Sequence, residues 1–195
     1  VAKRRVNVPG ISTLGGSIGD SIRWNASNNI LAQNPISQGD SISTSFEFST
    51  DAANNAVGGA DELVSFLQSI APGGSATVDL KSITNILQQA GVALSRIKGY
   101  KVRLLAASGR GAVDSTNGTA CSSITVGNAG SNPNTLELGG TNPTFTINSG
   151  GSHQHFDPSA AGFAAVTHTA KNVLITNNDG LVAAAVQVTL IGGTT

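Results

Sequence analysis

The chain has 195 residues, 39% of them hydrophobic and 11% charged, and its 11 basic and 11 acidic side chains give a formal net charge of zero. Ordinary soluble domains carry about 25% charged residues, so this surface is polar mainly through uncharged groups, which argues against long helices and favours β-structure. The neutral balance gives no reason to expect nucleic acid or an anionic membrane as a partner. The length suits one large domain whose core needs no disulfide or metal.

The first twenty residues follow no periodic pattern. They combine the basic run Lys3-Arg4-Arg5 with four glycines and a proline, and no apolar stretch follows that would predict a signal peptide or a membrane span. We expect residues 1–20 to be an irregular arm that orders on a partner or frays as a terminus. Residues 21–195 are then expected to form a single β-sandwich domain.

The first half of this domain is predicted to mix strands with a short helix. Regular structure is expected to begin at residues 21–24, and residues 41–48 alternate polar and apolar side chains as a half-buried strand does. The best helix candidate covers residues 60–70, where Leu63, Phe66, Leu67 and Ile70 have the spacing of one helical face. A second helical segment or turn is predicted over residues 82–89.

From Val92 onward the predicted elements are strands separated by Gly, Asn, Ser and Pro clusters. They cover residues 92–105, 122–126, 144–147, 154–156, 164–169, 172–176 and 181–191. The last two flank the turn-forming residues 177–180, so we expect them to pair as a hairpin. Alternate residues from Val182 to Leu190 should form a buried face. Short, evenly spaced strands predict an all-β fold, an antiparallel, jelly-roll-like β-sandwich with one short helix between its early strands.

One predicted strand concentrates basic side chains. Arg96, Lys98, Lys101 and Arg103 would form a stripe on one face if Gly99 allows a β-bulge. Such a stripe could dock an acidic patch on a neighbouring subunit. The simpler interpretation, which we favour, is a solvated strand face or an edge that its charge protects from aggregation.

The only residues with metal-ligand chemistry lie at 153–157. In a strand, His153, His155 and Asp157 project to one face about 7 Å apart, and His168 could add a ligand from a neighbouring strand. Some trimeric phage fibre tips hold a metal with a His-x-His pair, which this segment resembles in two residues. A polar pair before an Asp-Pro turn is the favoured interpretation, so no metal site and no cofactor is predicted.

Catalytic residues are not apparent, and we expect no enzymatic activity. Because Cys121 is the single cysteine, no intrachain disulfide can form. We interpret Cys121 as a small apolar residue. No nucleophile motif, acid pair or phosphate-binding loop is present in the sequence. Exposed aromatic residues interleaved with basic ones, which nucleic-acid binding needs, are also missing.

The pattern from Ala76 to Gly192 resembles small β-sandwich virion structural proteins of tailed bacteriophages, of the capsid-decoration type. It is carried by residues 77–83 (TVDLKSI), 94–100 (LSRIKGY), 123–127 (SITVG), 171–177 (KNVLITN) and 186–192 (VQVTLIG), with Gly150-Gly151, Asp157-Pro158 and Gly162-Phe163-Ala164 between them. The resemblance implies a non-enzymatic protein, often a trimer seated on a capsid.

The predicted function is therefore that of a head-decoration or capsid-stabilising protein in the virion, assembled in the host cytoplasm. Its partners would be the major capsid protein or other virion subunits and further copies of itself, with a trimer favoured. A principal shell subunit, a tail component and a cellular filament subunit share these features and remain alternatives.

A carbohydrate-binding or adhesin-like module is the alternative from another class. It would use loop residues Asn128, Asn132, Asn134 and Asn142, with Trp24 or Tyr100 as the aromatic platform. A β-sandwich glycosidase lacks the required carboxylate pair.

Overall fold

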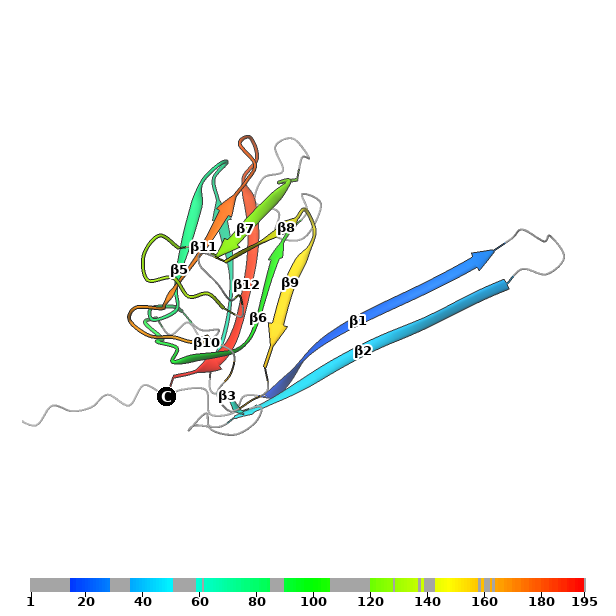
Figure 1. Cartoon of the computed structure of the whole chain (residues 1–195), viewed down its shortest axis with the longest axis horizontal. Helices are drawn as coiled ribbons and strands as arrows, with labels where there is room; N and C mark the ends of the chain where they lie inside the picture. Colours follow the sequence, from blue (N-terminus) through cyan, green and yellow to red (C-terminus); the bar gives the residue numbers. More distant parts are fainter. Residues whose placement is uncertain are drawn as a thin grey trace, which may run out of the picture.

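A computed structural model describes residues 15–28, 36–50, 59–60, 62–84, 90–105, 120–127, 129–136, 138, 143–157, 159, 162 and 164–194, the first two ranges through their backbone alone. Every regular element in this part is a strand (Figure 1). The described residues include no helix that is long and apolar enough to span a membrane. The strands are β1 (Gly15–Asn28), β2 (Ile36–Thr50), β3 (Gly59–Ala60), β4 (Glu62–Ile70), β5 (Ser75–Asp79), β6 (Arg96–Leu104), β7 (Ser123–Gly127), β8 (Thr144–Asn148), β9 (Ser152–Phe156), β10 (Ala164–Ala165), β11 (Asn172–Asn177) and β12 (Ala184–Gly193).

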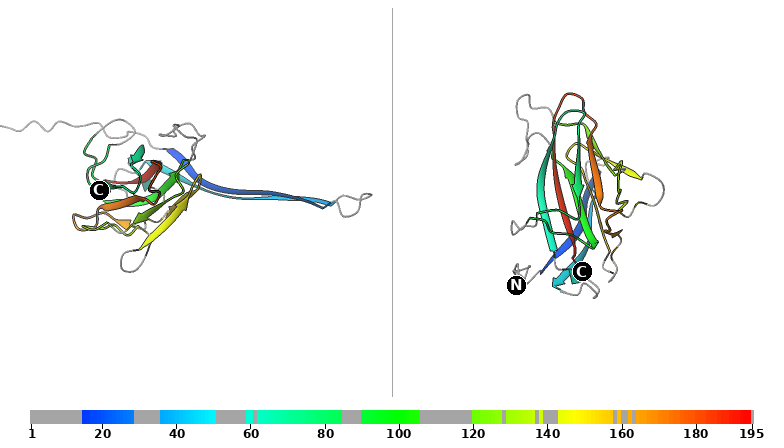
Figure 2. Two further views of the ribbon diagram at one scale, coloured as in Figure 1. Left: turned by 90° about the horizontal axis from the view of Figure 1, so that it is seen from above. Right: turned by 90° about the vertical axis from the view of Figure 1, so that its left-hand side faces the viewer.

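Nine of these strands, β4 to β12, build two antiparallel sheets. In the first sheet β4 pairs with β12 and β12 with β6, whose other side carries β9 and β10; the second sheet has the order β5-β11-β7-β8. The sheets lie as two layers (Figure 2). The pairs are nested along the chain, since β4 pairs with β12, β5 with β11, β6 with β9 and β7 with β8. The all-β, sandwich-like part of the predicted fold is thereby confirmed.

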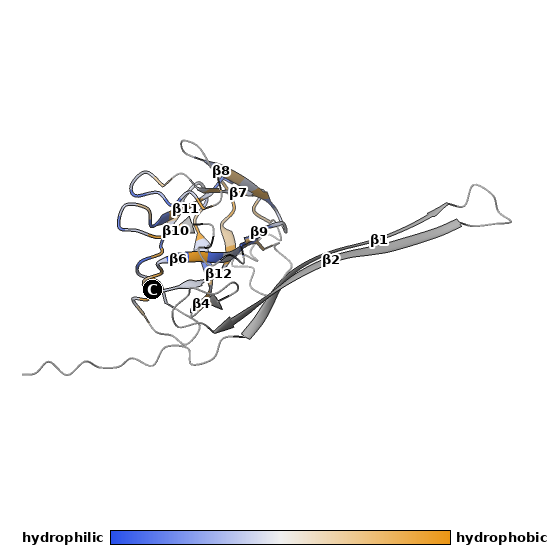
Figure 3. Cartoon of the chain, turned by 60° about the horizontal axis from the view of Figure 1, so that its bottom comes forward, coloured by the Kyte–Doolittle hydropathy of each residue, from blue (hydrophilic) through white to orange (hydrophobic). Residues whose placement is uncertain are grey.

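The core lies between the two sheets. Apolar and polar residues alternate along parts of the strands, as Figure 3 shows for β6, so that alternate side chains of a strand enter the core. On β12 the predicted buried face is confirmed, with Val186 fully buried and Val188 and Leu190 no more than 4% exposed. The second sheet adds Ile124, Val126 and Ile175 to the same hydrophobic cluster.

Strands β1 and β2 form a two-stranded ribbon that leaves the sandwich and extends far from it (Figure 1). Their antiparallel register runs unbroken from Gly15 opposite Ser49 to Asn28 opposite Ile36. The strand predicted at residues 41–48 is part of β2. Because β1 begins at Gly15, regular structure starts inside the segment expected to be an irregular arm; residues 1–14 lie outside the described part.

Residues 62–70 form strand β4, so the helix that their spacing predicts over residues 60–70 is wrong. The strand pairs with β12 without a break, from Glu62 opposite Gly192 to Ile70 opposite Ala184. Of the four residues of the predicted helical face, Ile70 is 2% exposed whereas Leu67 is 49% exposed. The apolar residues therefore do not share one face, and pairing along the whole of β12 outweighs the local helical pattern.

The predicted hairpin between residues 171–176 and 181–191 is also wrong. Both strands exist, but β11 lies in the second sheet and β12 in the first. The intervening residues cross from one layer to the other around Asn177, whose side-chain amide donates to the carbonyls of Ala71 and Val182 at 3.1 and 2.8 Å. Of the segment predicted as helix or turn at residues 82–89, Ile83 bridges to Val92, and residues 85–89 lie outside the described part.

Candidate functional site

The two candidate histidines lie on β9 and face the interior of the sandwich. His153 is opposite Val102 and His155 is opposite Tyr100 in the β6–β9 register. The His153 ring centroid lies 4.2 Å from that of Phe145 and 5.8 Å from that of Tyr100. Since Phe145 comes from β8 in the second sheet, this aromatic cluster closes one side of the sandwich.

The other members of the proposed ligand set do not complete a metal site. Asp157 Oδ1 accepts a hydrogen bond of 2.8 Å from the backbone N–H of Ser159, as a turn-initiating aspartate does. His168 lies in an exposed turn beyond β10. Among the residues that the structure describes, no three His, Cys, Asp or Glu side chains gather where they could hold a metal.

The basic strand is divided by the bulge that Gly99 was expected to allow. The β6–β12 register shifts there, with Gly99 opposite Ile191 and Ile97 opposite Gly192. Lys101 and Arg103 are exposed, but Lys98 is completely buried. Arg96 is half-buried, so only two of the four predicted basic side chains are fully exposed to solvent. Because β6 is an inner strand of its sheet, the charges do not protect an edge.

The base of the ribbon is fixed on the outer face of the first sheet. There β3 pairs in parallel with the end of β2, with Ala60 opposite Thr50, and also contacts β12. Ala60 and Ile191 form a small buried cluster with the half-buried Leu63 and Phe156. Sequence reasoning missed this anchor because its members lie on four strands that only the folded topology brings together.

The sandwich is open between edge strands β4 and β5, on the side away from the aromatic cluster of β8 and β9. It holds a groove of about 280 Å³. Phe66 and Gln68 line it from one sheet and Val78 from the other, with Ile83 in the segment that follows β5. Asp79 at the groove is neutralised by Lys171, whose ammonium lies 2.6 Å from its carboxylate.

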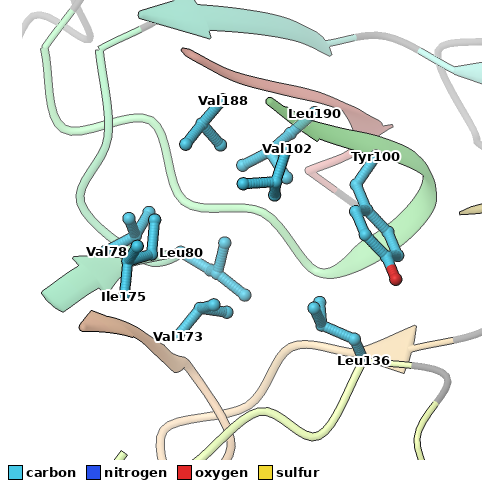
Figure 4. A pocket seen from close by; sticks show the side chains of 9 residues that line it. All are labelled: Val78, Leu80, Tyr100, Val102, Leu136, Val173, Ile175, Val188 and Leu190. Carbon is cyan, nitrogen blue, oxygen red and sulfur yellow. The ribbon is translucent and has the colours of Figure 1, made fainter. Parts of the chain in front are cut away.

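The cavity that the described residues enclose between the sheets is too small for a ligand. The apolar cavity there measures about 10 Å³ (Figure 4). A water molecule needs at least about that much space and several polar partners, so this cavity holds at most a single unsatisfied water. Its lining is entirely apolar apart from the phenol of Tyr100.

The outer face of the second sheet presents a row of hydroxyl groups. The registers place Ser75 opposite Thr176, Thr176 opposite Thr125, and Thr125 opposite Thr146, across all four strands. Ser75 and Thr176 share a hydrogen bond of 2.9 Å between their hydroxyls. The row itself is uncharged, and its hydroxyl groups cost little to desolvate when a partner satisfies their hydrogen bonds.

The residues proposed for sugar binding are dispersed. Tyr100 is 1% exposed and packs in the core, so it provides no platform. Asn134 is 3% exposed, and its amide donates to the carbonyls of Ala165 and Ala170. Asn132 is exposed. Asn128, Asn142 and the side chain of Trp24 lie outside the described part.

Comparison of the sequence with known protein families and with curated proteins finds no match to either.

Proposed function

We propose that this chain is a non-enzymatic virion structural protein that decorates and stabilises a bacteriophage head. It would bind the major capsid protein or neighbouring virion subunits as a homo-oligomer, with a trimer favoured, after assembly in the host cytoplasm. In this role the protein binds through its surfaces and breaks no bond.

We further propose that the β-sandwich has the topology of a jelly roll. The nested pairing supports it, because a jelly roll is a long antiparallel hairpin rolled up so that outer pairs enclose inner ones. Strands β4 and β12 form the outermost pair and β7 and β8 the innermost. Virus capsid domains use this architecture widely, and it suits a protein that presents flat faces to neighbours.

The protruding ribbon is the observation that carries the functional proposal. An isolated two-stranded ribbon is at best marginally stable in water, yet this one pairs over the full length of β1. At about 3.4 Å per residue the fourteen residues of β1 reach almost 50 Å. A ribbon of that length is best explained by a partner surface on which it lies.

The composition of the surface supports the same conclusion. Uncharged hydroxyl rows can be buried against a shell without the cost of removing charges from water. Repetition of the protein around a shell adds avidity, so a weak single contact suffices.

The register of the ribbon permits a direct test. Replacing residues 22–42 by Asn-Gly would leave Ser21 opposite Ser43 and close a shorter hairpin there. We expect the shortened chain to keep its thermal midpoint but to stop co-sedimenting with undecorated heads of its phage. Equal binding by both chains would refute the proposal. A positive glycan array without head binding would favour the carbohydrate-binding alternative.

A further inference from the structure

Within the part of the chain that the structure describes, strand β4 is a long sheet edge without the usual protection. It pairs with β12 on one side over all of its nine residues and without a bulge. Its sequence, ELVSFLQSI, holds no lysine, arginine, proline or glycine, and its one charge, Glu62, lies at the end. Natural sheet edges are normally shortened, bulged or charged, because a bare edge pairs with other strands.

The backbone on the free side of β4 has few partners among the described residues. From Leu63 onward only the carbonyl of Ser69 is used there, and it accepts from the side chain of Gln68. Leu67 stands 49% exposed on the outer face. On the inner face Phe66 and Gln68 line the open groove. Backbone, outer face and inner face thus all point to a strand that adds to this edge.

We propose that β4 of a second copy of this chain occupies this edge, antiparallel and related by a two-fold axis at Phe66. A two-fold antiparallel pair requires that one residue faces its own equivalent. Phe66 is the central residue of Glu62–Ile70, so this register is the one that pairs the strand over its full length. The first sheets of the two copies would join into one continuous sheet.

The side chains of β4 are complementary to themselves in this register. Phe66 meets Phe66 of the second copy at the groove, an aromatic cross-strand pair of the kind that stabilises sheets. On the outer face Leu67 lies opposite Ser65 and diagonal to Leu63 and Leu67 of the second copy, which covers its exposed surface. The two Glu62 carboxylates fall at opposite ends of the ladder, so like charges do not meet.

A second copy fits this edge better than an acidic or basic partner. The central residues of β4 are uncharged, and the only acid at the groove, Asp79, is already paired with Lys171. Among the described residues, the middle of this edge consequently offers no charge for a partner of opposite sign to recognise. The contact involves neither the ribbon nor the shell, so it can hold whether or not the proposed function is correct.

The register predicts a specific response to charge, because position 65 of each copy faces position 67 of the other. In a dimer of the Ser65→Glu/Leu67→Glu chain, two carboxylates therefore meet at each such contact, whereas Ser65→Lys/Leu67→Glu places opposite charges together. Both variants lose the same leucine and change the same exposed positions. By sedimentation equilibrium of the full-length chain we expect the first to weaken dimerisation at least about tenfold relative to the second. Mixing the first with Ser65→Lys/Leu67→Lys should restore the dimer.

Cross-linking tests the register independently. Ser65→Cys and Leu67→Cys chains should form a disulfide dimer when mixed and oxidised, and neither should do so alone, because position 65 faces position 67. A full-length chain that stays monomeric at high concentration would overturn the proposal. Self-association of equal affinity in the two charge variants would also overturn the proposal. Self-association that yields no mixed disulfide would overturn it as well. Co-sedimentation of the same variants with undecorated heads tests the proposed function separately from dimerisation.

Discussion

The ammonium of Lys171 lies 2.6 Å from Oδ2 of Asp79 and joins the end of β5 to the residue before β11. This hydrogen bond lowers the pKa of Asp79 below its ordinary value of 3.8, against the opposing effect of partial burial. The backbone N–H of Lys81 adds a second bond to the same carboxylate at 2.9 Å. The Lys171–Asp79 ion pair therefore stabilises β5, the edge strand of the second sheet, against its neighbour β11.

Replacing Lys171 by Met should destabilise the protein in a pH-dependent manner. Because the folded pKa of Asp79 is depressed, the stabilisation is present above about pH 4 and is lost as the pH falls through the folded pKa. We expect a difference of about 0.5–1 kcal/mol in the free energy of unfolding at pH 7, since both groups are partly solvated. Urea titrations at pH 7 and pH 3 measure it; a difference that persists undiminished at low pH would assign the effect to packing.

Asn177 should be the polar residue whose loss costs most. Its side chain is 1% exposed, donates to three carbonyls, and accepts from the N–H of Asp179 at 2.9 Å. Asn177→Ala leaves these buried groups without partners, so we expect a loss of about 2–4 kcal/mol in denaturant unfolding. Asn178→Ala is the matched control, because its amide is exposed and should cost no more than about 1 kcal/mol.

Gly127 should not accept any side chain. Its φ is +115°, and a Cβ atom there would lie 2.3 Å from the carbonyl oxygen of Pro143. We expect Gly127→Ala to lower the free energy of unfolding by at least about 2 kcal/mol. Gly180→Ala, where a Cβ atom would meet nothing within 4 Å, should stay within about 0.5 kcal/mol of the parent. Similar melting curves for both variants would contradict this account of the β7 terminus.

The thiol of Cys121 should not react with thiol reagents in the folded protein. Burial raises the pKa of its thiol above the ordinary value of 9.0, and the side chain is 3% exposed. Because the thiolate is the reactive form, Ellman's reagent at pH 8 should react only after unfolding in guanidinium. A fast reaction under native conditions would show that the β7 end of the sandwich opens readily.

Local alternation was enough to predict most of the second half of the fold, but not which strands pair. The turn at residues 177–180 has hairpin chemistry, yet Asn177 binds carbonyls of the β4–β5 connection and directs the chain into the other sheet. Likewise, residues 62–70 fit both a helical face and a strand, and only the distant partner β12 decides between them. Periodicity describes a segment by itself, whereas a sheet is defined by pairs.

The binding surfaces were less predictable than the strands. Sequence reasoning singled out His153 for its ligand chemistry, but the structure uses its ring as an aromatic contact with Phe145. Lys98 was grouped with the exposed basic residues because a bulge cannot be assigned a direction from sequence, and it is buried. The free edge of β4 could not be recognised at all, because being an edge is a property of the strand order.

The nesting of the strand pairs also governs how the protein folds. The strand that opens the sandwich, β4, pairs with the one that closes it, since Ile70 lies opposite Ala184. Topologies dominated by such distant pairings fold in milliseconds to seconds, more slowly than those built from local contacts. During synthesis, β4 therefore has no β12 to pair with until more than a hundred further residues have been made.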